Sequence, residues 1–360
     1  MPLQFGSWAS VCGSWLRTRD ADRKPRPDQL IQLARAVDGL GYDFLYVPEH
    51  YLNALHGPRE DVLDAWVVSA ACVAATQRLR VITAVQPGFK APGVVAKMGA
   101  TLAQFRPGGF GLSLLAGWWQ LEVENYADVW LPHGERYARA SEYLDVIRGL
   151  WTASELDYEG LYYTATRSLL EPKPDPLPPI FIAGESDRAI ELAARAGDYL
   201  FINGGDPDAV AALVGKAKRL ARERHGRSLR VALSAFGVVR ASQAEARRVV
   251  DGFRERADEV TIGYFQRHMD SAVVAHNRPS ASSTLEANLG LDAGLIGDPQ
   301  TILKRLAALE DAGVDAVLIK GEPALDEAER FARDVIAPYR AEHGAAARPS
   351  GAGESQPHVK

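Results

Sequence analysis

The chain has 360 residues, of which 47% are hydrophobic, so it can bury a large core, and intrinsic disorder is excluded for most of its length. The formal net charge of −5 leaves no broad basic surface, which argues against nucleic acid and anionic membranes as partners. Two cysteines, Cys12 and Cys72, are too few for a disulfide framework, and without a CxxC pair we expect no metal site. No signal-peptide pattern or membrane-length apolar run occurs, so we expect a cytoplasmic protein.

In the first half of the chain, short apolar runs alternate with segments whose apolar residues recur at helical spacing. The apolar runs predict four strands, at residues 3–8, 44–47, 79–85 and 110–115. The periodic segments predict helices at residues 30–40, 64–76, 93–106 and 135–150.

The second half repeats this alternation. Four further strands are predicted at residues 180–183, 199–202, 229–239 and 316–319, with helices at 186–196, 208–224, 299–312 and 326–339. Strands that alternate with helices predict an α/β fold, here a (β/α)8 TIM barrel formed by a single domain over residues 1–344. A doubly wound open sheet is the alternative, but residues 9–14 lack the glycine-rich turn that it would require after the first strand.

Two connections are longer than a barrel needs. Residues 150–179 end in the proline-rich run EPKPDPLPP, which predicts a stiff extended connection. Residues 240–315 form an extended insertion between the seventh and eighth strands, and its polar, non-periodic part at about 266–295 is interpreted as a lid, with disorder as the alternative. The small, polar residues 345–360 are interpreted as a disordered tail.

Catalytic groups of such barrels lie where the strands end at their carboxyl termini. His50 follows the second strand beside Glu49, and the imidazole group of histidine is suited to proton transfer near neutral pH. A histidine that is only hydrogen-bonded at the rim is the alternative. Trp118 and Trp119 follow the fourth strand and could wall a planar apolar ligand, or one of them could simply pack in the core.

The turn after the fifth strand is the clearest cofactor signal. Gly184 allows close approach of the backbone, and Ser186 begins a helix whose free N–H groups attract a phosphate. An ordinary N-cap serine is the alternative. Tyr137 and its neighbours at the start of the fourth helix could also hold an anion, although a solvated helix start explains them as well.

These residues, in this order, resemble the bacterial luciferase-like flavin monooxygenases from about Phe5 to Tyr339. The segments that carry the resemblance are PEHY (48–51), LDAW (63–66), AVQPG (84–88), AGWW (116–119), HGERY (133–137), EPKP (171–174) and AGES (183–186). GSWLR (13–17) and GWW (117–119) are most similar to the branch of the alkanesulfonate, dimethylsulfone and sulfoquinovose monooxygenases.

The resemblance implies a two-component enzyme in which a separate NAD(P)H:flavin reductase supplies FMN as FMNH2. O2 would be the co-substrate, and a flavin C4a-(hydro)peroxide would oxygenate a small organic substrate, such as a sulfonate or sulfone. The catalytic residues it implies are His50, Glu49 and Trp118. The cofactor-binding residues are Thr83, Ala84, Ser113, Tyr137, Gly184, Glu185 and Ser186. We expect Trp15, Arg17 and Trp119 to bind the substrate, and Arg267 and Arg278, the two guanidinium groups of the expected lid, to close over an anionic substrate.

The family also implies a homo-oligomer, a dimer or tetramer, and some of its members have a non-proline cis peptide in the third strand, here within residues 82–85. This chain departs from the alkanesulfonate enzymes at Val62, where they have cysteine, and at Ser234 and Phe236, where they have an arginine and a histidine. Glu322 replaces their tyrosine before the last helix. Two alternatives are an F420-dependent oxidoreductase of the same superfamily and a non-catalytic flavin-binding relative.

Overall fold

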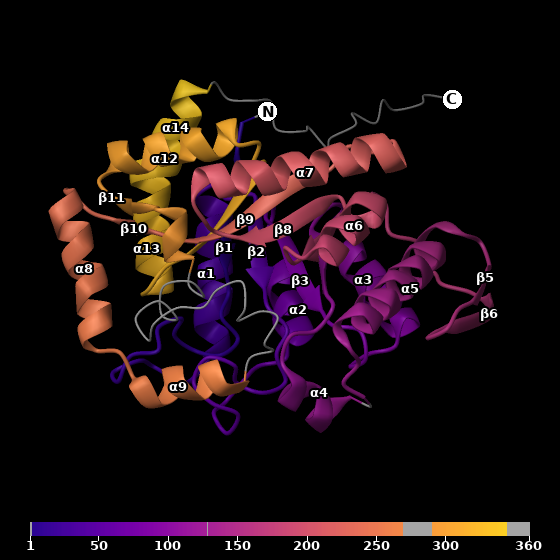
Figure 1. Cartoon of the computed structure of the whole chain (residues 1–360). Helices are drawn as coiled ribbons and strands as arrows, with labels where there is room; N and C mark the ends of the chain where they lie inside the picture. The colour runs from indigo at the N-terminus through magenta and orange to yellow at the C-terminus, as the bar shows by residue number, and fades with distance from the viewer. Residues whose placement is uncertain (1, 128, 269–289, 344–360) are drawn as a thin grey trace, which may run out of the picture.

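The computed structural model describes residues 2–127, 129–268 and 290–343. Its central sheet is a closed parallel barrel with the strand order β1-β12-β9-β8-β7-β4-β3-β2 (Figure 1). The barrel strands are β1 (Gln4–Trp8), β2 (Phe44–Val47), β3 (Arg80–Val85), β4 (Phe110–Leu115), β7 (Ile180–Ala183), β8 (Tyr199–Asn203), β9 (Arg230–Phe236) and β12 (Ala316–Lys320). Each of them lies within a residue or two of a predicted strand, apart from the end of β9, so the predicted TIM barrel is confirmed.

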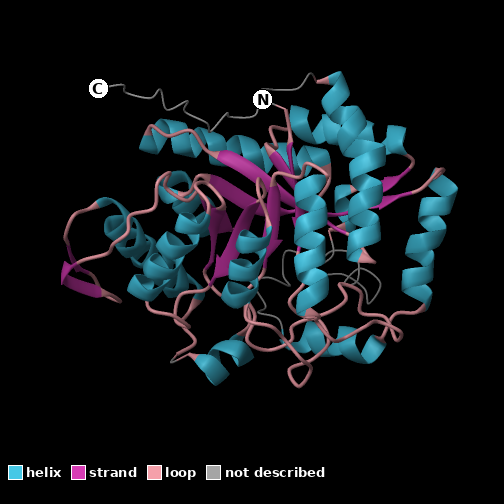
Figure 2. Cartoon of the chain, turned by 180° about the vertical axis from the view of Figure 1, so that it is seen from behind, coloured by secondary structure: helices cyan, strands magenta, loops and turns pink. Residues whose placement is uncertain are grey.

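Helices surround the barrel on its outside, as the view from behind shows (Figure 2). They are α1 (Pro27–Gly39), α2 (Ala65–Ala75), α3 (Pro92–Phe105), α5 (His133–Thr152), α6 (Asp187–Ala196), α7 (Pro207–His225), α12 (Pro299–Asp311) and α13 (Ala324–Phe331). The chain then continues through the π-helical turn η2 (Ala332–Ile336) into α14 (Ala337–Glu342). None of the helices in the described ranges combines the length and the apolar composition that a bilayer-spanning segment needs.

Side chains fill the inside of the barrel. Its lower part holds stacked aromatic rings, with the centroids of Phe181 and Tyr199 4.2 Å apart. Higher up, Leu318 of β12 faces Gly6 of β1, where a Cβ atom would lie only 2.8 Å from Leu318 Cγ. Glycine at position 6 therefore leaves room for Leu318. The interior is a packed core, so we look for the functional site at the carboxyl-end rim of the barrel.

The long connections contain more structure than the sequence predicts. Residues 150–179 include a hairpin of β5 (Leu156–Glu159) and β6 (Thr164–Ser168), so the prediction of a purely extended connection is wrong. The hairpin is half exposed and polar, which hides it from a search for apolar runs. Its turn is held by the Glu142 carboxylate, which accepts backbone N–H bonds from Leu161 and Tyr162 at 2.9 and 2.8 Å.

The insertion before β12 also contains helices, α8 (Gln243–Glu255) and α9 (Glu259–His268), followed by the short turn η1 (Leu291–Ala293). The predicted seventh strand is divided into β9 and β10 (Val238–Val239), and β10 leaves the barrel to pair with β11 (Ile296–Gly297). At the break, Gly237 N–H donates to the Lys320 carbonyl oxygen at 2.9 Å. A further helix, α4 (Gln120–Tyr126), follows β4.

Most of the expected lid (266–295) and all of the expected tail (345–360) lie outside the described residues. The cis peptide bonds in the described ranges precede Pro172, Pro176 and Pro323. The expected non-proline cis bond within residues 82–85 is therefore wrong, and this stretch of β3 pairs with β4 along its whole length.

Asn53 fastens the loop after β1 to the loop after β2. Its side chain is fully buried, and its Nδ2 donates to the carbonyl oxygens of Cys12 and Asp61 at 2.9 and 2.7 Å. Its Oδ1 accepts the backbone N–H groups of Leu55 and His56 at 3.0 and 2.9 Å. One side chain thereby satisfies four backbone groups that the two loops would otherwise bury unpaired.

Two more side chains hold the loop after β1 in place. His56 Nε2 lies 2.9 Å from the Ser14 carbonyl oxygen, which can only accept, so Nε2 carries the proton. From the other side, a carboxylate oxygen of Glu322, which follows β12, accepts the Trp15 N–H at 2.9 Å. The loop that carries Trp15 and Arg17 is thus fixed on both flanks at the rim.

Replacement of Leu318 by alanine should cost about 2–5 kcal/mol of unfolding free energy, because the cavity would lie in a fully packed barrel interior. Leu161→Ala is the matched control, since that side chain is 83% exposed in the hairpin turn, and it should change the value by less than about 0.5 kcal/mol. Urea unfolding followed by circular dichroism measures both. Equal losses in the two variants would contradict the described packing.

A pH dependence of stability follows from His56. Burial lowers the pKa of His56 from 6.5 to about 4, so the folded state binds a proton less readily than the unfolded state. The stabilising contribution is complete above pH 6.5 and is lost as the pH falls from about 6.5 to about 4, by up to roughly 3 kcal/mol. The difference in unfolding free energy between the parent and His56→Gln should shrink over this range. A difference that stays constant from pH 7 to pH 4.5 would show that His56 is not buried as a neutral group.

Candidate active site

Five buried polar atoms at the carboxyl-end rim of the barrel have no hydrogen-bond partner among the described residues. They are Trp15 Nε1, His50 Nδ1, Gln86 Oε1, Trp119 Nε1 and Ser234 Oγ. The first four follow the ends of β1, β2, β3 and β4, and Ser234 lies in β9. Because native proteins leave few buried polar atoms unpaired, these atoms are candidate partners for a ligand or for ordered water.

His50 lies against a carboxylate that belongs to α4. His50 Nδ1 is 3.6 Å from Glu122 Oε1, too far for a hydrogen bond but close enough for an ion pair if the imidazole is protonated. Glu122 is fully buried, and the same oxygen accepts the N–H groups of Tyr51 and Leu52 at 2.7 and 3.1 Å. The carboxylate is therefore fixed, and it can orient the imidazole.

Glu49, next to His50, is already occupied by partners. One of its carboxylate oxygens accepts the Gln86 N–H at 2.7 Å and the other lies 2.8 Å from Lys90 Nζ. Burial raises the pKa of Glu49, and the positive charge of Lys90 opposes this shift. Lys90 also binds the hydroxyl group of Tyr51. Because of these contacts, Glu49 connects the rim loops to each other and is not free to act as a base.

Aromatic rings form a wall next to His50. The Trp118 ring meets the imidazole edge-on at 5.6 Å, and its centroid lies 6.2 Å from that of Phe265 in α9. Trp119 is almost fully buried beside them, 6.0 Å from Trp118. Figure 1 shows α4 and α9 together at the lower end of the molecule, away from the N-terminus. Trp118 thus faces His50, whereas Trp119 packs behind it.

On the β1 side of the rim, two buried cations lie among aromatic rings. The Arg17 guanidinium carbon is 4.0 Å from the Phe265 ring centroid, and Lys320 Nζ is 4.2 Å from that of Trp8 and 5.4 Å from that of Trp15. Burial lowers the pKa of Arg17 to about 10. Burial, and then the charge of Arg17, lower the pKa of Lys320 to about 7.

The turn between β7 and α6 has the shape expected of an anion cradle. Gly184 has a φ of +138°, and a Cβ atom there would lie 2.9 Å from the Tyr137 hydroxyl oxygen. Ser186 is the N-cap of α6, and its Oγ accepts the Ala189 N–H at 3.2 Å. Burial raises the pKa of Tyr137, and a hydrogen bond with Ser186 opposes this. The hydroxyl groups of Tyr137 and Ser186 therefore meet at the N-terminus of α6.

The remaining expected cofactor residues differ in where they point. Glu185 Oε1 accepts the Asn203 N–H at 2.7 Å and so joins the ends of β7 and β8. Ala84 and Ser113 lie inside the barrel, where Ser113 Oγ is 3.1 Å from the Tyr46 hydroxyl oxygen. The hydroxyl group of Thr83 donates to Ser69 of α2 at 2.7 Å, so this side chain faces away from the barrel interior. Arg278 and the side chain of Arg267 lie outside the described part of the chain.

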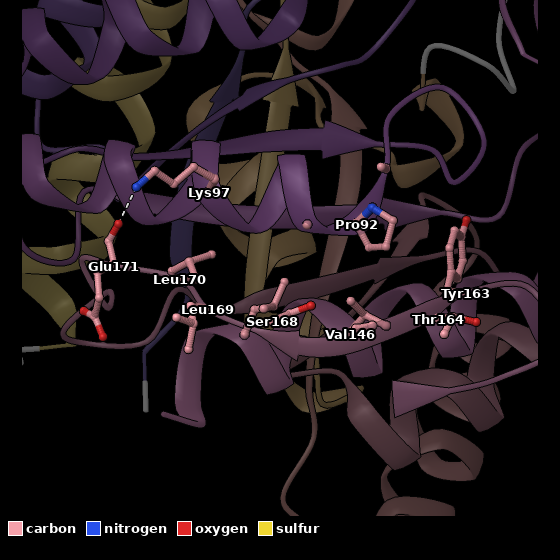
Figure 3. Close-up of a pocket in the computed structure, with 13 residues that line it drawn as sticks. Pro92, Lys97, Val146, Tyr163, Thr164, Ser168, Leu169, Leu170 and Glu171 are labelled. Carbon is pink, nitrogen blue, oxygen red and sulfur yellow. Dashed lines mark hydrogen bonds between the residues drawn. The ribbon is translucent and has the colours of Figure 1, made fainter. Parts of the chain in front are cut away.

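A separate cavity of about 500 Å³ lies outside the barrel, between α3, α5 and the hairpin (Figure 3). Its wall combines apolar residues such as Pro92, Val146 and Leu170 with polar residues such as Thr164 and Ser168. The Lys97 ammonium group at its edge binds the Glu171 carbonyl oxygen. No residue of the rim described above contributes to this wall, so the cavity is not part of the candidate site.

Sequence reasoning missed three members of the rim: Glu122, Lys320 and Gln86. Glu122 lies in a helix that the sequence did not reveal, and nothing in its neighbourhood along the chain links it to His50. Lys320 is the charged residue that ends a strand of otherwise apolar residues, which was a usable signal. Gln86 follows β3 in the segment AVQPG, and its residue type alone indicates no role.

Comparisons with known proteins agree with this architecture. The chain is 30% identical over 346 residues to an FMNH2-dependent dimethylsulfone monooxygenase from Pseudomonas putida, with 93% of this chain and 94% of that protein covered. It is 33% identical over 343 residues to the enzyme of the same name from Pseudomonas fluorescens (strain Pf0-1), with 93% of each covered.

Among solved structures, an F420-dependent secondary alcohol dehydrogenase in complex with an F420-acetone adduct aligns with a TM-score of 0.73 at 20% identity. The alignment covers 94% of this chain and 99% of that one, and it shows a shared fold. Residues 3–316 match the family described as luciferase-like monooxygenase. This match spans most of the chain, and the protein therefore belongs to the luciferase-like monooxygenase family.

Proposed function

We propose that this protein is a two-component, FMNH2-dependent monooxygenase that uses O2 to oxygenate a small organic substrate of the organosulfur class, a sulfonate or a sulfone. The observation that carries the proposal is the β7–α6 turn, where Gly184, Tyr137 and Ser186 form a cradle at a helix N-terminus. The names of the Pseudomonas relatives support the same cofactor and the same class of substrate.

The residues of the cradle fit the phosphate group of FMN. Gly184 lets the Tyr137 hydroxyl group approach the turn closely, because a Cβ atom at this position would lie 2.9 Å from it, and the N–H groups of the first turn of α6 supply donors and a partial positive charge. Tyr137 and Ser186 add hydroxyl donors. Reduced FMN, when bound, supplies the electrons that activate O2.

The chain's own residues would then control protons and water. His50 is the proton-transfer group, and the fixed Glu122 carboxylate, 3.6 Å from Nδ1, sets the ring orientation. Trp118 and Phe265 form an apolar wall that excludes water from this side of the rim. Glu49 and Lys90 hold the loop that carries His50.

The proposal also includes a partner protein, an oligomeric state, a location in the cell and a domain boundary. A separate flavin reductase would deliver FMNH2, the chain would act as a homo-oligomer in the cytoplasm, and residues 1–344 would form one domain. F420 is distinguished from FMN by an anaerobic titration with each reduced cofactor, in which we expect FMNH2 alone to bind at micromolar concentrations or below.

Ser186→Ala should weaken FMNH2 binding about ten- to a hundred-fold, because it removes one hydrogen bond to a charged group. Ser242→Ala is the matched control, since Ser242 caps α8 with the same 3.2 Å bond, to the Glu245 N–H, without taking part in the cradle. Both variants should lose a similar, small amount of stability from the lost cap. Anaerobic fluorescence titration measures the affinities, and an unchanged dissociation constant for Ser186→Ala would place the phosphate elsewhere.

His50→Ala should bind FMNH2 almost normally but lose at least about a hundred-fold in turnover, and it should release more hydrogen peroxide. Glu122→Gln should give a smaller loss in the same direction, because it removes the carboxylate charge that lies 3.6 Å from His50 Nδ1. The control is His225→Ala, since His225 makes a comparable contact with Glu191, at 3.1 Å, on the helices outside the barrel. If His50→Ala turned over substrate within a few-fold of the parent, His50 would be a structural rim residue.

A further inference from the structure

The cavity between α3, α5 and the hairpin is a second concave site, separate from the rim. Its volume of about 500 Å³ lies within the range of small-molecule pockets in proteins. Figure 3 shows Lys97 and Glu171 at one end of it, Pro92 and Tyr163 at the other, and Val146 between them. Pro92 and Lys97 belong to the same helix, so about 7.5 Å of helix axis separates the two ends, and the cavity is elongated.

The first end of the cavity carries a positive charge. The Lys97 ammonium group binds the carbonyl oxygen of Glu171, whereas the carboxylate of the same residue points away from it (Figure 3). Lys97 forms no ion pair with any carboxylate in the part of the chain that the structure describes. An ammonium group has three protons, so Lys97 keeps donors for a further acceptor. This end is suited to a carboxylate from a ligand.

The other end offers neutral hydrogen-bonding groups. The residues Tyr163 and Thr164 line it, and neither of their hydroxyl groups has a hydrogen-bond partner among the described residues. α3 begins at this end, and its N-cap, Ala91, has no side-chain bond to the first turn, which leaves N–H groups for another acceptor. A Cβ atom on Gly93 would have only Leu150 Cδ1 near it, at 3.8 Å, so the start of α3 is open to the cavity. This end is suited to a hydroxyl group.

Between its ends, the cavity has an apolar side that belongs to α5. Val146 and Leu150, one helical turn apart, line it, and both are buried. Leu170, which follows β6, adds a third buried apolar side chain to the wall. An alkyl chain placed here would lose contact with water and would be stabilised by the hydrophobic effect.

Tyr143 separates the cavity from the rim. Its ring is fully buried and lies 5.6 Å from that of Tyr163, and its hydroxyl group donates to the Lys90 carbonyl oxygen at 3.0 Å. Lys90 in turn binds Glu49 on the side of the rim. A ligand in the cavity would therefore not reach His50, and we expect its binding to be independent of the flavin.

We propose that this cavity binds a linear aliphatic carboxylate with a hydroxyl group at its far end. The carboxylate lies at Lys97, the alkyl chain along Val146 and the hydroxyl group at Tyr163. The site goes beyond the proposed function, because neither the flavin nor its substrate takes part in it. The probe is 6-hydroxyhexanoate, since hexanoate lacks only its hydroxyl group and hexane-1,6-diol lacks only its carboxylate.

Calorimetric titration should show that 6-hydroxyhexanoate binds at least about ten-fold more tightly than hexane-1,6-diol and about three-fold more tightly than hexanoate. Lys97→Met should remove the first preference, and Lys97→Arg should keep most of it because the charge remains. Tyr163→Phe should remove the second preference and leave the affinity for hexanoate unchanged. The controls are Lys304→Met, at an exposed lysine of α12, and Tyr162→Phe, beside the cavity but not in its wall; both should bind as the parent does.

A second pair of variants tests where the probe binds. Ala165→Trp fills the cavity from β6 and should abolish binding, whereas Thr166→Trp places the same ring on the next, exposed residue outside the wall and should not. Circular dichroism checks that each variant is folded.

The proposal is overturned if the parent does not bind 6-hydroxyhexanoate at millimolar concentrations or binds the three probes equally. It is also overturned if Ala165→Trp binds as the parent does, or if both tryptophan variants lose affinity equally. Competition between the probe and saturating FMN would place the probe at the rim and would contradict the separate site.

Discussion

β1 pairs in parallel with both β12 and β2, and this pairing closes the sheet into a barrel. The first and the last barrel strands along the chain therefore lie side by side. Every barrel strand then presents its carboxyl end at the same rim. Residues as far apart in sequence as Trp15 and Glu322 thereby come within hydrogen-bond distance, 2.9 Å. The candidate site exists only because of this closure, since no single segment of the chain contains more than a part of it.

Buried charged side chains at the rim have two kinds of surroundings, an opposite charge or aromatic rings. Glu49 and Lys90 satisfy each other and tie two loops together, so they contribute to order. Arg17 and Lys320 lie among aromatic rings instead, with the Arg17 guanidinium carbon 4.0 Å from the Phe265 ring centroid and Lys320 Nζ 4.2 Å from that of Trp8.

The sequence predicted the barrel well because each barrel strand is an apolar run and most surrounding helices have regular periodicity and caps, such as Asp298 at the start of α12. It failed for the hairpin, whose strands are polar and half exposed, and for α4, α8 and α9. For the candidate site, it predicted the residues that follow strand ends, His50 and Ser186 among them, and their roles stay predictions. It could not find Glu122, because that residue approaches His50 only through the fold, and it misjudged Thr83, whose side chain faces α2.

The central claim is that the cofactor lies at this rim with its phosphate at the β7–α6 turn. A crystal structure of the protein with FMN tests it most directly. We expect electron density for the phosphate within hydrogen-bond distance of Tyr137, Ser186 and the first N–H groups of α6, and for the flavin ring on the side of His50. Phosphate density at another place, such as the cavity between α3, α5 and the hairpin, would contradict the account.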